Sequence, residues 1–168
     1  MNAPLFTDPA DPKQVSADRS VREFEQAGVP ASKLVLGVPF YGHEWGQVPA
    51  KNHGLYQPGK SVPGAFADYA TITGAMLNTA GRQAGFVRYW NDAAKVPFLY
   101  NARTQVFVSY DDPESMRLKA EYARSHHLAG VMFWEYFADP SGALLDAIDA
   151  TLLHQNSVSV HTKTESPR

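Results

Sequence analysis

The fold is decided by an apolar run at residues 33–40, which reads Lys-Leu-Val-Leu-Gly-Val-Pro-Phe. It has the length of a β-strand and lacks the alternation of polar and apolar side chains that marks a half-buried strand. Such a strand is buried on both faces, as in a parallel sheet that is covered by helices. Residues 129–135, Ala-Gly-Val-Met-Phe-Trp-Glu, form a second run of the same kind. The two runs therefore predict two strands of a parallel sheet.

A helix is expected before the first run. Ser16 suits the N-cap of a helix over residues 17–27, in which Val21 and Phe24 would lie on the buried face. Gly28 is a typical residue at a helix end.

Two more helices are expected around the second run. Asp112 is a suitable cap, and Pro113 fits the first position of a helix that ends near His126. Leucine and isoleucine at helical spacing between residues 144 and 153 predict a last amphipathic helix.

The segment between the two runs has a different character. Residues 42–110 are rich in glycine, proline and aromatic side chains, with strand-like pieces near 86–90, 96–100 and 105–110 and a weak helical piece near 68–79. We interpret this segment as a small α+β insertion.

The alternation of helix and strand favours a parallel sheet or an α/β barrel. In such a barrel, the chemistry lies at the carboxyl ends of the strands. Here those ends are residues 41–45, Tyr-Gly-His-Glu-Trp, and residues 134–136, Trp-Glu-Tyr. Both combine aromatic rings, which suit the apolar faces of sugars, with carboxylates, which suit sugar hydroxyls.

Composition excludes several classes of function. The net charge of -2 gives no reason to expect nucleic acid or an anionic membrane as a partner. No cysteine is present, which excludes disulfides and thiolate metal sites, and no run approaches the roughly 20 apolar residues of a membrane span. The adjacent His126 and His127 face different directions on a helix and have no third ligand nearby, so no metal site is predicted. The first residues do not have the pattern of a signal peptide, and localisation is left unassigned.

Four blocks of the sequence follow one another in a recognisable order: residues 2–5 (Asn-Ala-Pro-Leu), residues 27–42, the pieces 88–92, 95–98 and 108–112, and residues 130–135. Through these blocks the chain resembles the chitinases of glycoside hydrolase family 18. In that family they correspond to the loop after the sixth barrel strand, the seventh strand with its approach, the chitinase insertion domain with its exit, and the eighth strand.

The resemblance implies an α/β fold, namely a partial (β/α)₈ TIM barrel that consists of the last two βα units. Residues 1–41 and 111–154 would form this barrel part, and residues 42–110 the inserted α+β domain. Residues 155–168 are polar and without periodicity, and are expected to be a disordered tail.

The resemblance also implies an activity. Family members hydrolyse β-1,4 links between N-acetylglucosamine units with retention, and the nucleophile is the N-acetyl oxygen of the substrate itself. The general acid is the Glu of an Asp-x-x-Asp-x-Asp-x-Glu motif, and a Tyr-Asp pair on the sixth strand orients the acetamido group. The motif does not occur in residues 1–168, which begin just after the place of that pair. We therefore assign no catalytic residue, and we expect the chain alone to be inactive as an enzyme.

Substrate-binding residues carry over more directly. Trp134 matches the Trp that forms the floor under the distorted sugar, and Tyr41 matches an aromatic residue near the cleaved bond. His43 stands where the family often has Arg, so a fixed cation becomes a titratable group, with Glu44 beside it. Trp45 is a candidate for the same groove.

Trp90 and Asp92 lie where the insertion domain walls the groove in the family. Carboxylates elsewhere are interpreted as structural: Asp111 in a turn, Asp112 as a helix cap, and Glu135 bound to backbone or Arg.

The expected partner is chitin or a chito-oligosaccharide, without a cofactor. A non-catalytic chito-oligosaccharide-binding module and a peptidoglycan-directed relative are the alternatives. A quarter of a barrel would leave the apolar faces of Leu34, Leu36, Val131 and Phe133 without partners. We therefore expect self-association, or a partner that supplies the missing N-terminal half of the barrel.

Overall fold

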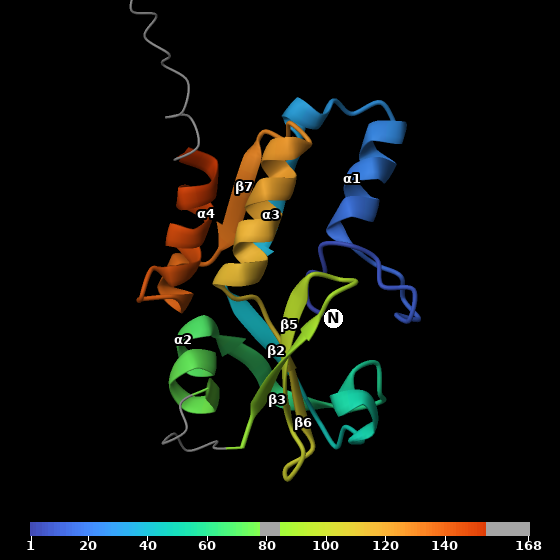
Figure 1. The fold of residues 1–168 in the computed structure, drawn as a ribbon, viewed down its shortest axis with the longest axis vertical. Coiled ribbons are helices and arrows are strands. Elements are labelled where there is room, and N and C mark those ends of the chain that lie inside the picture. The colour runs from blue at the N-terminus through green and yellow to red at the C-terminus, as the bar shows by residue number, and fades with distance from the viewer. Residues whose placement is uncertain (78–84, 154–168) are drawn as a thin grey trace, which may run out of the picture.

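The computed structural model describes residues 1–77 and 85–153. It contains two sheets (Figure 1). β1 (Val35–Pro39) and β7 (Gly130–Trp134) form a parallel pair. An antiparallel sheet has the order β3-β2-β6-β5-β4, with bounds β2 (Tyr41–Gly46), β3 (Lys60–Asp68), β4 (Val87–Asn91), β5 (Val96–Asn101) and β6 (Val106–Ser109).

Three longer helices lie around the parallel pair: α1 (Ala17–Gln26), α3 (Pro113–Ser125) and α4 (Ala143–Leu153) (Figure 1). Helix α2 (Tyr69–Thr71) continues into a π-helical turn (Ile72–Leu77) beside the antiparallel sheet. Single turns of 3₁₀-helix occur at Ala31–Lys33, Lys51–Gly54 and Tyr136–Ala138. None of the helices in the described residues is long and apolar enough to cross a membrane.

The predicted helix starts are confirmed. The Ser16 hydroxyl accepts a hydrogen bond from the Arg19 amide, 3.1 Å away, and α1 begins at the next residue. Asp112 and Ser115 form a reciprocal capping box at the start of α3, where Pro113 occupies the first turn.

The predicted strands are confirmed as well, but the insertion contains more sheet than the sequence indicated. Residues 41–46 and 60–68 form two strands that were not predicted, β2 and β3, and they pair with each other. The helical piece expected over residues 68–79 is seen at 69–77, and its end lies outside the described residues. The tail predicted at residues 155–168 also lies outside them.

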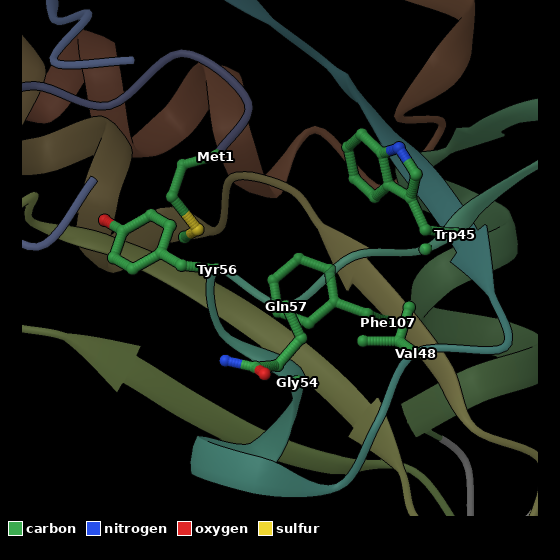
Figure 2. Close-up of a pocket in the computed structure, with 8 residues that line it drawn as sticks. Met1, Trp45, Val48, Gly54, Tyr56, Gln57 and Phe107 are labelled. Atoms are coloured by element: carbon green, nitrogen blue, oxygen red, sulfur yellow. The ribbon is translucent and has the colours of Figure 1, made fainter. Parts of the chain in front are cut away.

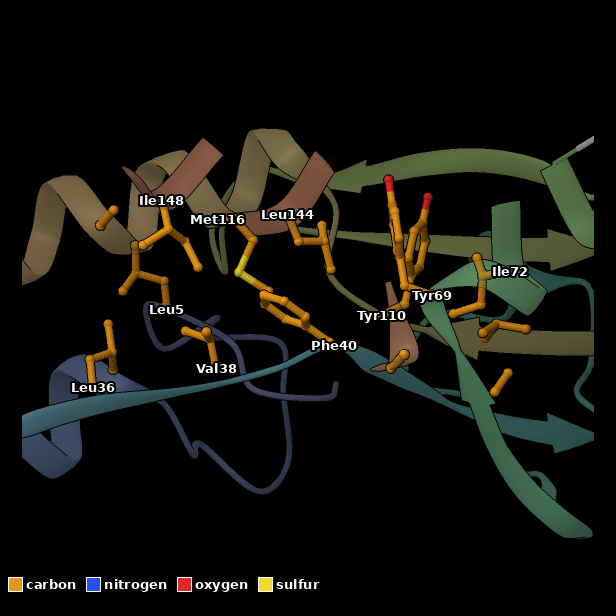
Figure 3. Packing of buried hydrophobic residues seen from close by; sticks show 14 of the residues in the cluster. Leu5, Leu36, Val38, Phe40, Tyr69, Ile72, Tyr110, Met116, Leu144 and Ile148 are labelled. Atoms are coloured by element: carbon orange, nitrogen blue, oxygen red, sulfur yellow. The ribbon is translucent and has the colours of Figure 1, made fainter. Parts of the chain in front are cut away.

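One continuous core joins the two sheets (Figure 3). Leu36 and Val38 of β1 point toward α3 and α4, and Phe40 at the end of the strand stacks on Phe133 with ring centroids 4.8 Å apart. The same cluster continues to Tyr110 and Ile72 beside the antiparallel sheet. Each such side chain contributes about 1.5–3 kcal/mol when it is fully buried. The core therefore holds the antiparallel sheet against the end of the parallel pair.

The prediction that the parallel strands are buried on both faces is wrong. Val35 and Met132 are 55% and 52% exposed, because none of the described residues covers that face of the two-stranded sheet. The expectation that Leu34, Leu36, Val131 and Phe133 would lack partners is also wrong. Leu36 is buried, and the other three side chains pack against the helix-covered core.

The predicted orientation of α1 is half right. Val21 is buried, but Phe24 is 55% exposed and lines a concavity beside Val35. Phe24 faces the open side of the parallel pair, where no described residue reaches over it.

Candidate functional site

The candidate site lies at the carboxyl ends of β1 and β7. There the Phe40 amide donates a hydrogen bond to the Trp134 carbonyl over 2.7 Å. Trp134 is 64% exposed although it is the largest kind of apolar side chain. It lines a concavity of about 260 Å³ that also contains the side chains of Tyr41, Phe66, Asp68, Glu135 and Ala138. We call this concavity the Trp134 pocket.

The register of β2 on β3 places three of these side chains. Tyr41 lies opposite Asp68, and His43 lies opposite Phe66. Directly opposed residues share a face of the sheet. The Phe66 ring is consequently 5.5 Å from the Tyr41 ring and 4.5 Å from the His43 ring, measured between centroids.

The aromatic side chains on this face continue along β2. Tyr41, His43 and Trp45 alternate along the strand and so share one face. The centroids of His43 and Trp45 are 5.9 Å apart, and the Trp45 ring is 6.0 Å from Phe107 of β6. We call Tyr41, His43, Trp45 and Phe66 the aromatic row. It runs from the Trp134 pocket along β2, with Phe66 of β3 beside it.

Glu44 does not join the aromatic row. It lies opposite Val108, whereas His43 lies opposite Ser109, so the two neighbours point to opposite faces of the sheet. Burial raises the pKa of the Glu44 carboxyl, and desolvation lowers the pKa of the His43 imidazole. Both groups are therefore displaced toward their neutral forms.

Trp90 and Asp92 are also separate from the row. Strand register places Tyr89 opposite Phe98 on the face of His43, so Trp90, the next residue, lies on the other face. There the Arg88 guanidinium sits 5.3 Å from the centre of its ring. Asp92 is exposed beyond the end of β4, and its pKa is lowered by the hydrogen bond from Lys95. The structure thus brings together Trp134, Tyr41, His43 and Trp45, but not Glu44, Trp90 or Asp92.

Two carboxylates of the Trp134 pocket have no partner within residues 1–77 and 85–153. The described residues supply neither Asp68 nor Glu135 with a side-chain hydrogen bond or an ion pair. Glu135 was expected to bind backbone or an Arg, and that expectation is wrong. Both carboxylates are exposed and can accept hydrogen bonds from a ligand.

Phe66 and Asp68 were missed from the sequence. Their alternation, Phe-Ala-Asp, indicates a half-buried strand, but it does not say which strand is the partner. Only the pairing with β2 brings them to the Trp134 pocket.

The interpretation of Asp111 and Asp112 as structural holds. Asp112 caps α3, and Asp111 forms a buried ion pair with Lys119. Within residues 1–77 and 85–153, no three His, Asp or Glu side chains are grouped as metal ligands would be.

Comparison with known proteins identifies the family. Residues 1–139 match the model of the family described as Glycosyl hydrolases family 18. Chitinase A1 of Niallia circulans is 41% identical over 165 residues, which cover 90% of this chain and 23% of that protein.

Solved structures of chitinases share the fold of this chain. A chitinase from Bacillus thuringiensis superposes with a TM-score of 0.83 at 40% identity, over 91% of this chain and 28% of that one. A class V chitinase from Nicotiana tobaccum, solved in complex with NAG4, gives a TM-score of 0.77 at 28% identity, over 89% of this chain and 42% of its own.

The fold defines a mixed α/β protein with an exposed aromatic site at the strand ends. The chain belongs to glycosyl hydrolase family 18, and its fold is part of the TIM barrel of that family's chitinases. It spans about a quarter of the length of Chitinase A1.

Proposed function

We propose that this chain forms the floor and one wall of a groove that binds chito-oligosaccharides. The observation that carries the proposal is the exposed Trp134 in a concavity with Tyr41 and two unpartnered carboxylates. An aromatic face beside a few polar acceptors suits a sugar ring, which has an apolar face and hydroxyls at its edge. The antiparallel sheet, within the insertion domain that we assign to residues 42–110, supplies the wall.

In the complete family enzyme, we expect this groove to serve substrate-assisted, retaining hydrolysis of β-1,4-linked N-acetylglucosamine. A general acid must lie within hydrogen-bond reach of the leaving oxygen. Residues 1–168 contain no Asp-x-x-Asp-x-Asp-x-Glu motif to supply it. By itself, the chain is proposed to bind the sugar without cleaving it.

The second candidate is a binding module that acts without catalysis. The floor residue Trp134 without the acid motif favours it. A relative directed at peptidoglycan is the third candidate, because an aromatic floor with carboxylates suits any N-acetylated glycan.

Calorimetric titration with the tetramer of N-acetylglucosamine tests the binding claim. Trp134→Ala should weaken binding about 30-fold or more, because a central aromatic anchor is typically worth about 2 kcal/mol. Phe24→Ala, another exposed aromatic residue, is the matched control and should leave the affinity unchanged. Equal affinities for the Trp134→Ala variant and the unmodified chain would overturn the proposal. A preference for muramic-acid-containing oligomers would favour the peptidoglycan candidate.

A fluorogenic chitobioside tests the catalytic claim. The 168-residue chain should show no turnover, whereas retention on a chitin column should persist. Turnover that survives both Trp134→Ala and Glu44→Gln would contradict the floor assignment and the absence of an acid.

A further inference from the structure

A second cavity opens on the antiparallel sheet beyond the far end of the aromatic row (Figure 2). It has a volume of about 170 Å³, and the side chains on its walls include Met1, Trp45, Val48, Tyr56, Gln57 and Phe107. Figure 2 shows the Trp45 indole and the Tyr56 ring on opposite sides of the opening, with the Phe107 ring between them. A cavity of this size is too small for an oligosaccharide, so it would hold a single sugar unit at most.

The Tyr56 wall is fixed by hydrogen bonds. Its hydroxyl donates to the Asp8 carboxylate over 2.8 Å and accepts from the Asn91 amide over 3.0 Å. The Asn91 amide also donates to Asp8, over 2.8 Å. These three side chains come from the N-terminal loop, the segment after β2 and the end of β4, so the ring position is set by distant parts of the chain. A wall that is ordered before binding loses little entropy when a ligand arrives.

The Phe107 wall is fixed by packing. Phe107 stacks on Phe98 with centroids 5.3 Å apart, and Phe98 stacks on Tyr89 at the same distance. The backbone at Gly59 lies so close that an added Cβ would sit 2.7 Å from a methyl group of Val48. This packing holds the Phe107 ring in place and leaves no room for a side chain at Gly59.

Gln57 supplies a polar group at the cavity. Its amide nitrogen donates to the Leu55 carbonyl over 3.2 Å, which orients the side chain. The described residues offer no donor to its Oε1. A neutral acceptor beside aromatic walls matches a sugar hydroxyl or acetamido N–H, and it does not favour a charged ligand.

The aromatic row connects the two concavities. Tyr41 and Trp45 are four positions apart along β2, so their backbones are roughly 13 Å apart. A ligand that covers Trp134 must therefore be a longer oligosaccharide to reach the second cavity.

We propose that this second cavity is a distal subsite for one sugar unit of a long chito-oligosaccharide, with Gln57 as its polar contact. The inference rests on the proposed function, because the Trp134 pocket holds the rest of the chain of sugars. The subsite adds affinity for long oligomers and none for short ones.

Tryptophan-fluorescence titration with the dimer and the hexamer of N-acetylglucosamine tests this subsite. The unmodified chain should bind the hexamer more tightly than the dimer. Gln57→Ala and the size-matched Gln57→Leu should weaken hexamer binding about three- to tenfold, the range for one lost hydrogen bond, and leave dimer binding unchanged. Gln26→Ala, at the exposed end of α1, is the matched control and should change neither affinity.

The outcomes separate the two proposals. Dimer and hexamer affinities that respond equally to Gln57→Leu, or that do not respond at all, would overturn the distal subsite and leave the proposed function standing. Failure of both oligomers to bind the unmodified chain would remove both. Thermal melting of each variant shows whether the fold is intact.

Discussion

At the scale of residues, His43 and Glu44 show how one position along a strand changes the environment of a side chain. They are adjacent in sequence, but strand alternation sends His43 to the aromatic row and Glu44 to the opposite, helix-covered face. Burial raises the pKa of Glu44, so the folded state favours its protonated form. Its contribution to stability is present below the unfolded pKa of about 4.3 and is lost as the pH rises through the folded pKa.

Glu44→Gln should therefore raise the melting temperature at pH 7, where the wild-type carboxylate is charged while half-buried. The difference should shrink toward pH 4, where Glu44 is mostly protonated in both states. Differential scanning calorimetry at the two pH values measures this, with the exposed Glu25→Gln as control. A variant that melts lower at pH 7 would show that Glu44 is stabilised by its charge.

The buried ion pair of Asp111 and Lys119 is the second residue-scale feature. Both side chains are almost completely inaccessible, and Asp111 Oδ1 also accepts a hydrogen bond from Ser115 over 2.7 Å. Lys119→Met should destabilise the fold by about 3–5 kcal/mol, because it leaves an unpaired buried carboxylate. The double variant Lys119→Met with Asp111→Leu should recover part of that loss.

Urea unfolding of the two variants checks this expectation. Arg117→Ala removes an exposed partner of Glu121 and should change stability by less than about 1 kcal/mol. A double variant that is less stable than Lys119→Met alone would mean that Asp111 serves mainly its bond to Ser115.

At the scale of elements, α1 depends on its cap. Ser16 is buried and satisfies the Arg19 amide at the start of the helix, whereas Ser20 is exposed one turn later. Ser16→Ala should lower the unfolding free energy by about 1 kcal/mol, and Ser20→Ala should change it much less. Urea unfolding compares the two serines directly, and equal losses would show that the Ser16 hydroxyl does not act as the cap.

Elements with local signals were predictable from the sequence. Ser16, Asp112 and Pro113 mark helix starts, and the apolar runs at 33–40 and 129–135 mark the parallel strands. The strand at 60–68 was not predictable, because its partner β2 is fixed by long-range pairing rather than by a local pattern. The apolar composition of the parallel strands predicted burial of both faces. In the described residues, only one face is covered.

The residues of the candidate site also differ in how far the sequence predicts them. Trp134 and Tyr41 follow directly from their positions at strand ends. The positions of Phe66 and Asp68 in the site are set by the register of β3 on β2. The separation of Trp90 from the aromatic row is set by the registers of all the strands between β4 and β2. Residue type alone does not contain that information.

At the scale of the whole molecule, the open face of the parallel pair is the dominant feature. Val35, Met132 and Phe24 are exposed together on the side away from α3 and α4. Contiguous exposed apolar surface beside an unpaired strand edge favours association. We expect light scattering to report a mass above 18.5 kDa for the chain in solution. Met132→Lys should lower the associated fraction, and a monodisperse monomer that melts cooperatively would contradict the expectation.

The central claim is that sugar binds on the face of Trp134, and a nitrogen–proton correlation spectrum tests it most directly. The chain has three tryptophans, at positions 45, 90 and 134, so their indole N–H signals report on the far end of the row, the opposite face and the floor. On titration with the hexamer of N-acetylglucosamine, the Trp134 and Trp45 signals should shift and the Trp90 signal should remain in place. A shift of the Trp90 signal while that of Trp134 stays unchanged would contradict the account.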